Sequence, residues 1–178
     1  MEALKQYRPL SEKEEEYKNK MLELYEAKGK KAFSRNNLEA HFTASAWIIN
    51  SHSKEILLLH HKKLNKWLQP GGHADGETDL EKVARKEVNE ETGLENLKLV
   101  SNDVYDIDIH LIPENKGIPE HYHYDVRFAY FCESNEKTRI NHESNDFQWI
   151  KIKEVETLTQ EPSILRMVKK SKNLLNGL

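Results

Sequence analysis

The sequence predicts an α+β protein in which runs of strands are interrupted by single helices. Short β-prone stretches cover residues 42–50, 55–61 and 66–73, the last ending at a Pro-Gly-Gly stop, and others cover 97–112, 121–132 and 147–152. One helical pattern, over residues 79–92, separates these two groups, and another lies near residues 164–175. Strands in runs with few helices favour an α/β/α sandwich over a regularly alternating parallel fold.

An N-terminal helix is predicted over residues 11–28. Ser11 and Glu14 match a capping box, apolar residues follow at helical spacing, and Gly29 marks the end. A polar connector comes next, and from His41 onward the sequence consists mainly of short, apolar, β-prone segments. We therefore expect residues 1–40 to form a helical extension and residues 41–178 to form the main domain. The helix packs either on that domain or on a second subunit, so a homodimer is left open.

Composition excludes several classes of protein. The chain has 178 residues, of which 32% are charged, with a formal net charge of -3. This balance lacks the basic bias of a general nucleic-acid binder. The longest apolar runs, such as residues 56–59, are far too short to cross a bilayer, so no membrane association is expected. One cysteine, Cys132, cannot form an internal disulfide, which favours a reducing, cytoplasmic location.

Three glutamates distinguish the predicted helix over residues 79–92. Its apolar stripe consists of Leu80, Val83, Ala84 and Val88. At about 100° per residue, Glu87 and Glu91 project into this stripe and Glu90 lies at its border. Carboxylates directed inward must be paired, hydrogen-bonded or bound to a metal, and a hard ion such as Mg²⁺ prefers oxygen ligands. The sequence therefore predicts a metal site here, with a solvated acidic patch as the alternative.

The segment GGHADGETDLEKVARKEVNEETGL resembles the signature box of the Nudix hydrolase family, G-x5-E-x7-R-E-U-x-E-E-x-G-U, in which U is aliphatic. Anchored at Gly72, the match runs to Leu94 and aligns all three glutamates. Two positions depart from the pattern. Thr78 stands where a glutamate is expected, with Glu77 one residue early, and Lys86 stands where an arginine is expected. In the family those two positions mainly brace the loop and helix, whereas the last three glutamates hold the metal.

A second alignment, anchored at Gly71, recovers Glu77 and Arg85 but leaves Lys86 as an insertion before Glu87. We prefer the first alignment because an insertion would rotate the arginine away from its expected position on the helix. Lysine keeps the charge of arginine without its forked hydrogen bonding. We therefore expect activity to survive with a less rigidly held metal site.

The resemblance implies a Nudix-type α/β/α sandwich with a mixed sheet and an N-terminal helical extension. It also implies a Nudix-type pyrophosphohydrolase that cleaves a diphosphate linkage in a nucleoside diphosphate derivative or a similar small molecule. The implied ligands of Mg²⁺ or Mn²⁺ are the carbonyl of Gly72 and the carboxylates of Glu87, Glu90 and Glu91. One carboxylate must accept a proton from the attacking water. We expect Glu87 to be this catalytic base, with Glu143 as its main rival and Asp146 as a weaker one.

Substrate contacts are expected from His73, Lys86, His123 and Arg127. Alternation along HYHYDVRF places His121, His123, Asp125 and Arg127 on one strand face, and Asp106, Asp108 and His110 share a face in DIDIH. If these strands pair, their polar residues form one surface. Three interpretations of it stay open: recognition of phosphate or base, a separate transition-metal site, and a solvent-facing sheet surface.

Two other functions compete with hydrolysis. A non-catalytic ligand sensor of this family commonly loses box acids, whereas all three are present here. An isopentenyl-diphosphate isomerase, which shares this general fold, pairs a cysteine with a glutamate. The chain has only Cys132 for that purpose, and this residue is expected to be buried in a late strand.

Overall fold

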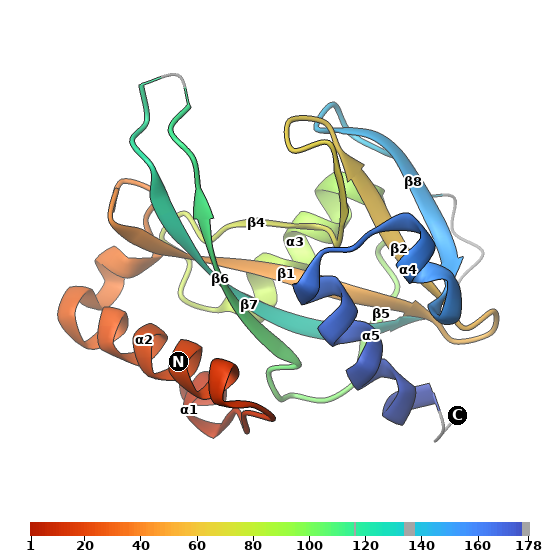
Figure 1. Ribbon diagram of the computed structural model, residues 1–178, viewed down its shortest axis with the longest axis horizontal. Coiled ribbons are helices and arrows are strands. Elements are labelled where there is room, and N and C mark those ends of the chain that lie inside the picture. Colours follow the sequence, from red (N-terminus) through yellow and green to blue (C-terminus); the bar gives the residue numbers. More distant parts are fainter. Residues whose placement is uncertain (116, 134–137, 176–178) are drawn as a thin grey trace. The chain divides into compact units, whose positions relative to one another are not determined.

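Two long strands, β1 (Ala40–Asn50) and β7 (His121–Cys132), organise the structure, a computed structural model that describes residues 1–115, 117–133 and 138–175 (Figure 1). The chain divides into two compact units. Unit 1 consists of Met1–Ser45, Gly71–Ala84 and Ser101–Phe128, and unit 2 consists of Ala46–Pro70, Arg85–Val100 and Ala129–Leu178. Strands β1 and β7 and the central helix α3 contribute residues to both units.

The remaining elements are short apart from three helices. The strands are β2 (Glu55–His61), β3 (Lys66–Leu68), β4 (Gly71–His73), β5 (Leu97–Leu99), β6 (Asp106–Ile112) and β8 (Ser144–Lys151). The helices are α1 (Glu2–Gln6), α2 (Glu12–Lys28), α3 (Leu80–Thr92), α4 (Val155–Leu158) and α5 (Pro162–Leu175), with 3-10 turns η1 (Gly29–Phe33) and η2 (Ile152–Glu154). Hydrogen bonds join the strands in the order β3-β2-β1-β7-β5, with β4 on β1, β6 on β7 and β8 on β2.

Helix α2 begins where the capping signal predicts. The Oγ of Ser11 accepts the backbone N–H of Glu14 at 3.2 Å, and Gly29 ends the helix with a φ of 54°. The carboxylate of Glu14 is buried and accepts from the hydroxyl of Tyr7 and from the backbone N–H of Leu10. Helix α2 packs on β6 of the same chain. Of the two expected locations for this helix, the structure therefore has the intramolecular one.

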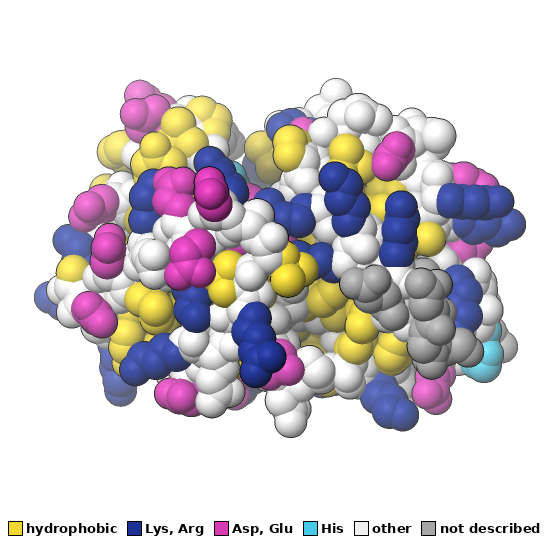
Figure 2. Space-filling model, turned by 60° about the horizontal axis from the view of Figure 1, so that its bottom comes forward, with side chains coloured by type: hydrophobic (Ala, Val, Ile, Leu, Met, Phe, Trp, Pro, Cys, Tyr) yellow, Lys and Arg dark blue, Asp and Glu magenta, His cyan; other side chains and the backbone are white. Residues whose placement is uncertain are grey.

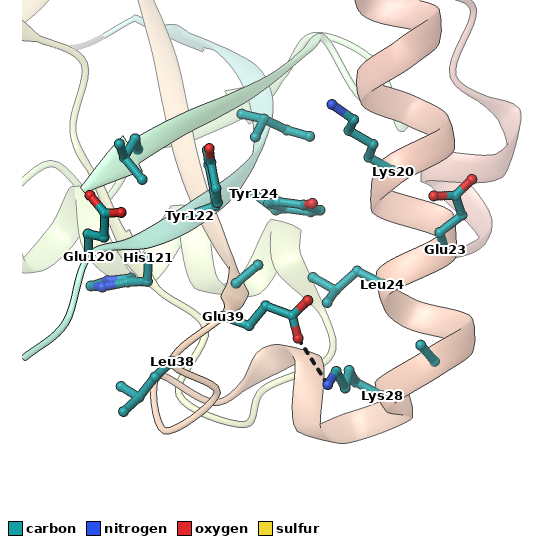
Figure 3. Close-up of a pocket in the computed structure, with 14 residues that line it drawn as sticks. Lys20, Glu23, Leu24, Lys28, Leu38, Glu39, Glu120, His121, Tyr122 and Tyr124 are labelled. Carbon is teal, nitrogen blue, oxygen red and sulfur yellow. Dashed lines mark ion pairs between the residues drawn. The ribbon is translucent and has the colours of Figure 1, made fainter. Parts of the chain in front are cut away.

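Unit 1 is built on a sheet with one apolar and one polar face. Strand pairing sets Asp106 opposite Arg127, Asp108 opposite Asp125 and His110 opposite His123, so β6 and β7 pair as the sequence predicts. The intervening residues Phe42, Ala44, Ile107 and Val126 are buried on the other face. Helix α2 lies over that apolar face, where its Leu24 and the sheet residues Ile109 and Tyr124 line a common cavity (Figure 3).

Strand β4 corrects one expectation. The Pro-Gly-Gly sequence was expected to end strand structure, but strand pairing resumes directly after Pro70. Gly71, Gly72 and His73 pair with Ser45, Ala44 and Thr43 of β1. A Cβ added at Gly71 would lie 2.7 Å from the Cα of Ser45 and 2.8 Å from the carbonyl oxygen of Ala44. Only glycine permits the backbones to approach this closely, so Gly71 is required for the pairing that positions His73.

Unit 2 has an apolar core between its strands and α5. Trp47 is fully buried, and its indole N–H donates to the hydroxyl of Ser171 on α5 at 2.7 Å. The α5 residues Ile164, Met167 and Val168 are buried at the spacing of one helix face. None of the described helices has the length and apolar character needed to cross a lipid bilayer. Acidic and basic side chains are interspersed on the face shown in Figure 2, with apolar side chains in small groups.

Candidate active site

Helix α3 presents its three glutamates as the helical period predicts. The side chain of Glu87 is 16% exposed and that of Glu90 is 52% exposed, while Glu91 is a buried residue. Asp79 caps the helix by accepting the backbone N–H of Lys82 at 3.3 Å, and Gly93 ends it with a φ of 71°. Glu87 and Glu91 therefore point inward and Glu90 lies at the border.

The ammonium group of Lys86 lies between two of these acids. Its Nζ is 3.3 Å from Oε1 of Glu87 and 3.1 Å from Oε2 of Glu90. Burial raises the pKa of Glu87, the positive charge of Lys86 opposes that rise, and the negative charges of Glu90 and Glu143 add to it. The donor set of three carboxylates fits a divalent metal ion, which would displace the ammonium group of Lys86 from Glu87 and Glu90.

Glu143 lies close enough to Glu87 for its charge to raise the pKa of the Glu87 carboxyl. Its backbone is fixed: the N–H donates to the side chain of Asn141 at 2.9 Å, and the carbonyl accepts the N–H of Lys62 at 2.9 Å. Its own side chain is 47% exposed. Asp146 is exposed further along β8, and its carboxylate accepts the N–H of Phe147 at 2.8 Å. Unit 2 thus brings together Glu87 and its main rival as a base.

Glu77 stabilises the start of α3, although Thr78 occupies the box position at which the family pattern has a glutamate. Its carboxylate accepts the backbone N–H groups of Thr78 at 2.9 Å and Asp79 at 3.0 Å, and it pairs with Lys82 at 2.6 Å. These contacts, with the hydrogen bond from Lys82 the largest, lower the pKa of Glu77 to about 2. The displaced glutamate therefore occupies the helix N-terminus, where a negative charge is favourable. The acidic residue one position early in the box was the signal for this arrangement.

Arg85 anchors the second half of α3 within unit 2. Its Nη1 donates to the carbonyl oxygen of Leu97 at 2.9 Å, and its guanidinium carbon lies 5.1 Å from the ring centroid of Tyr130. A guanidinium bracing the helix is what the resemblance implies for the position that Lys86 occupies. In this chain Arg85 makes such contacts, and Lys86 contacts the acids.

The other predicted site residues, Gly72, His73, His123 and Arg127, belong to unit 1. The rings of His73 and His123 lie 4.8 Å apart between centroids. Burial lowers the pKa of His73 to about 4 and that of His123 to about 2, and neighbouring positive groups contribute to both shifts. Both imidazoles are therefore neutral near pH 7.

Arg127 is the centre of a buried ion cluster. Its guanidinium lies 2.8 Å from Asp125, 3.2 Å from Asp106 and 3.5 Å from Asp108, and Arg127 itself is only 2% exposed. Asp125 also accepts the hydroxyls of Thr43 at 3.0 Å and Ser45 at 2.7 Å. The interpretation of this surface as solvent-facing is therefore wrong. The contacts give Arg127 a structural role, and its role in substrate binding stays a prediction.

His41 completes this polar face and was not among the expected site residues. It is 1% exposed, and its ring lies 5.0 Å from that of His121 and 4.9 Å from that of His123. The signal was present in His41-Phe42-Thr43-Ala44-Ser45, where polar and apolar residues alternate. Alternation assigns His41 to the face of Thr43 and Ser45. Alternation does not show that His121 and His123 of β7 lie beside His41.

Comparison with known proteins agrees with this architecture. A family model described as NUDIX domain matches residues 39–170. A Caenorhabditis elegans Ap4A hydrolase in a binary complex matches at a TM-score of 0.59 with 20% identity, covering 77% of this chain and 98% of that one. The Escherichia coli dihydroneopterin triphosphate pyrophosphohydrolase matches at 0.59 with 15% identity, covering 72% and 92%. The NUDIX domain of Shewanella oneidensis NrtR, complexed with ADP ribose, matches at 0.54 with 16% identity, covering 75% and 87%.

The fold is therefore the Nudix α/β/α sandwich with a mixed sheet, as the sequence predicts. No curated protein sequence matches the chain significantly. The family match covers most of the chain and includes the whole signature box. The chain therefore belongs to the Nudix family.

Proposed function

We propose that the protein hydrolyses a diphosphate linkage in a nucleoside diphosphate derivative and that the reaction depends on Mg²⁺ or Mn²⁺. The observation that carries the proposal is the cluster on α3, where Lys86 lies between Glu87 and Glu90 and Glu91 is buried. Three carboxylates along one helix, two of them directed inward, offer the oxygen ligands that a divalent ion takes. In this family, a divalent ion held by the box glutamates promotes hydrolysis of a diphosphate linkage.

Glu87, Glu90 and Glu91 would hold the ion, and the backbone carbonyl of Gly72 is carried over from the family resemblance as a further ligand. A divalent ion, when bound, neutralises diphosphate oxygens and lowers the pKa of bound water. We assign the removal of a proton from the attacking water to Glu87. Its position supports this role, because its carboxylate is directed inward beside the other box acids and lies close to the charge of Glu143. Glu143 is the second candidate for the same step.

The remaining predicted contacts concern the substrate. Lys86, already beside the acids, supplies positive charge for phosphate oxygens. His73, His123 and Arg127 stay predictions for substrate recognition. Two relatives support a nucleotide-derived substrate, since one is called an Ap4A hydrolase and another holds ADP ribose. We also retain a cytoplasmic location, on the basis of the single cysteine, and a helical extension over residues 1–40 as parts of this proposal.

A product screen tests the proposed reaction. The full-length protein is incubated with ADP-ribose, dinucleoside polyphosphates, nucleotide sugars, nucleoside triphosphates and capped RNA, each with Mg²⁺ and with Mn²⁺. Mass spectrometry of the products, in water enriched in ¹⁸O, identifies the bond that is cut. We expect turnover on one class, with cleavage between phosphorus atoms. Binding of a nucleotide without any turnover, under conditions where the metal is bound, would contradict hydrolysis and favour a ligand sensor.

Replacing Lys86 by methionine should change the pH dependence of the reaction. Lys86 opposes the burial-driven rise in the pKa of Glu87, so its loss should raise that pKa further. If ionised Glu87 is required, the acidic limb of kcat/KM should move to higher pH in Lys86→Met. The pH profile at a fixed metal concentration measures the shift, with Lys98→Met, an exposed lysine on β5, as the control. An unchanged acidic limb would exclude Glu87 as the group that titrates.

A further inference from the structure

Three histidines converge on the polar face of unit 1. His41 comes from the start of β1, and His121 and His123 come from the start of β7. One ring nitrogen from each histidine lies within 4.8 Å of those of the other two, in a search of the described residues. His41 and His121 are buried, and His123 is half-buried. The cluster contains none of the three box glutamates.

The tautomers of two of these histidines follow from their partners. The Nδ1 of His41 lies 3.1 Å from the carbonyl oxygen of Asn37, and the Nδ1 of His121 lies 2.8 Å from that of Pro119. A carbonyl oxygen can only accept, so each Nδ1 carries the hydrogen. In a neutral imidazole the Nε2 then has a bare lone pair. Metal-binding histidines commonly have this arrangement, in which one ring nitrogen donates a hydrogen bond and the other binds the metal.

The Nε2 atoms of His41 and His123 are buried and have no hydrogen-bond partner among the described residues. A buried polar nitrogen without a partner costs free energy, which a ligand at that position would recover. Two such nitrogens in one cluster are explained together by a cation that accepts electron pairs from both. A water molecule donates two hydrogen bonds and could satisfy both nitrogens, so the cobalt spectrum decides between the two occupants.

Charged groups of both signs act on the cluster, since Arg35 lowers and Asp75 raises the pKa of His41 after the larger effect of burial. Asp106, Asp108 and Asp125 surround one guanidinium on the same sheet face, so carboxylates outnumber cations there. Asp108 also lies 3.2 Å from the Nδ1 of His110, whose ring contacts that of His123 at 5.5 Å between centroids.

We propose that His41, His121 and His123 bind a divalent transition-metal ion, with Zn²⁺ as the best fit. Three imidazole nitrogens are typical of Zn²⁺ and unlike the oxygen ligands that Mg²⁺ takes. Tetrahedral Zn²⁺ with bonds of about 2.0–2.1 Å needs nitrogens roughly 3.4 Å apart, so the rings close by a small rotation on binding. A water molecule or His73, whose ring lies 4.8 Å from that of His123, supplies the fourth ligand.

The cavity beneath α2 lies on the apolar face of the sheet, opposite the face that carries His123, and it meets the cluster at His121. The cavity has a volume of about 690 Å³, and His121 lines it with Glu39, Glu120 and Tyr122 (Figure 3). The bound ion would link the start of β1 to the start of β7, segments that are 80 residues apart by number, and so stabilise the folded protein.

Cobalt substitution tests the site in the full-length protein. Co²⁺ in a tetrahedral, nitrogen-rich site absorbs visible light strongly, whereas Co²⁺ on octahedral oxygen ligands absorbs weakly. We expect one equivalent of the strong signal, displaced by Zn²⁺. His123→Gln and His121→Gln should weaken binding by about 100-fold or more, which exceeds the usual effect of losing a supporting contact. His52→Gln, in an exposed turn, and the double variant Glu90→Gln/Glu91→Gln should retain it.

Two results would overturn the proposal. The first is a strong signal lost in the glutamate double variant and kept in His123→Gln, and the second is the absence of any such signal in the wild-type protein. A measurement without variants covers the case in which a histidine variant does not fold. Ring ¹⁵N shifts of the wild-type protein should move at Nε2 of His41, His121 and His123 on adding Zn²⁺, and unchanged shifts would contradict the site.

Discussion

Replacing Glu90 by glutamine should reduce turnover by about 10²–10⁴-fold, the range associated with losing a catalytic acid–base or metal-ligating group. Glu90 is half-exposed and contacts Lys86 at 3.1 Å, so the change removes a charge without opening a core cavity. The fold should therefore persist and the defect should appear in kcat. The measurement is steady-state turnover at saturating metal, with circular dichroism to show that the variant is folded.

Glu95→Gln is the matched control for this prediction. Glu95 is an exposed acid just beyond the end of α3, and its carboxylate lies 3.4 Å from the side-chain amide of Asn89. The same loss of one charge at this position should leave turnover within about threefold of wild type, since surface substitutions have small effects. Equal activity of Glu90→Gln and Glu95→Gln would show that the box acids are a solvated patch.

Replacing Arg127 by methionine should destabilise the protein by about 3–5 kcal/mol, the usual cost of removing one partner from a buried ion pair. The guanidinium contacts Asp106, Asp108 and Asp125 at 2.8–3.5 Å, and the carboxylates would remain buried together without it. Urea unfolding monitored by fluorescence measures the change in the free energy of unfolding. If the variant does not accumulate as folded protein, the loss of stability exceeds this range.

Arg8→Met controls for the loss of an arginine at an exposed position near the N-terminus. It should change the free energy of unfolding by less than about 0.5 kcal/mol, as is usual for surface substitutions. If Arg127→Met unfolded at the same urea concentration as Arg8→Met, the ion cluster would not contribute to stability. Arg127 could then be assigned to substrate binding without a competing structural role.

Local periodicity predicts much of this molecule. The helical period alone places Glu87 and Glu91 inward on α3, and the alternation of HYHYDVRF places His123 and Arg127 on one face. The pairing of β6 with β7 could be proposed because the two segments are adjacent in the chain and alternate in the same way. These features depend on neighbours in sequence, which is why they can be predicted.

Long-range features could not be predicted in the same way. Alternation shows which residues share a face but not whether that face is covered, so the burial of Arg127 was missed. The pairing of Gly71 with Ser45 and the meeting of His41 with His123 depend on strand partners distant in the chain. Glu77 was missed for another reason: a flexible side chain can reach the helix N-terminus from one residue early.

Removing divalent metal from the purified protein tests the central claim most directly. Turnover on the substrate identified by the product screen is measured after treatment with a chelator and again after adding Mg²⁺ or Mn²⁺. We predict that chelation abolishes hydrolysis of the diphosphate linkage, that Mg²⁺ or Mn²⁺ restores it in wild type, and that the same addition fails to restore it in Glu90→Gln. Full turnover in the chelated protein, confirmed free of metal by mass spectrometry, would contradict a metal site on α3.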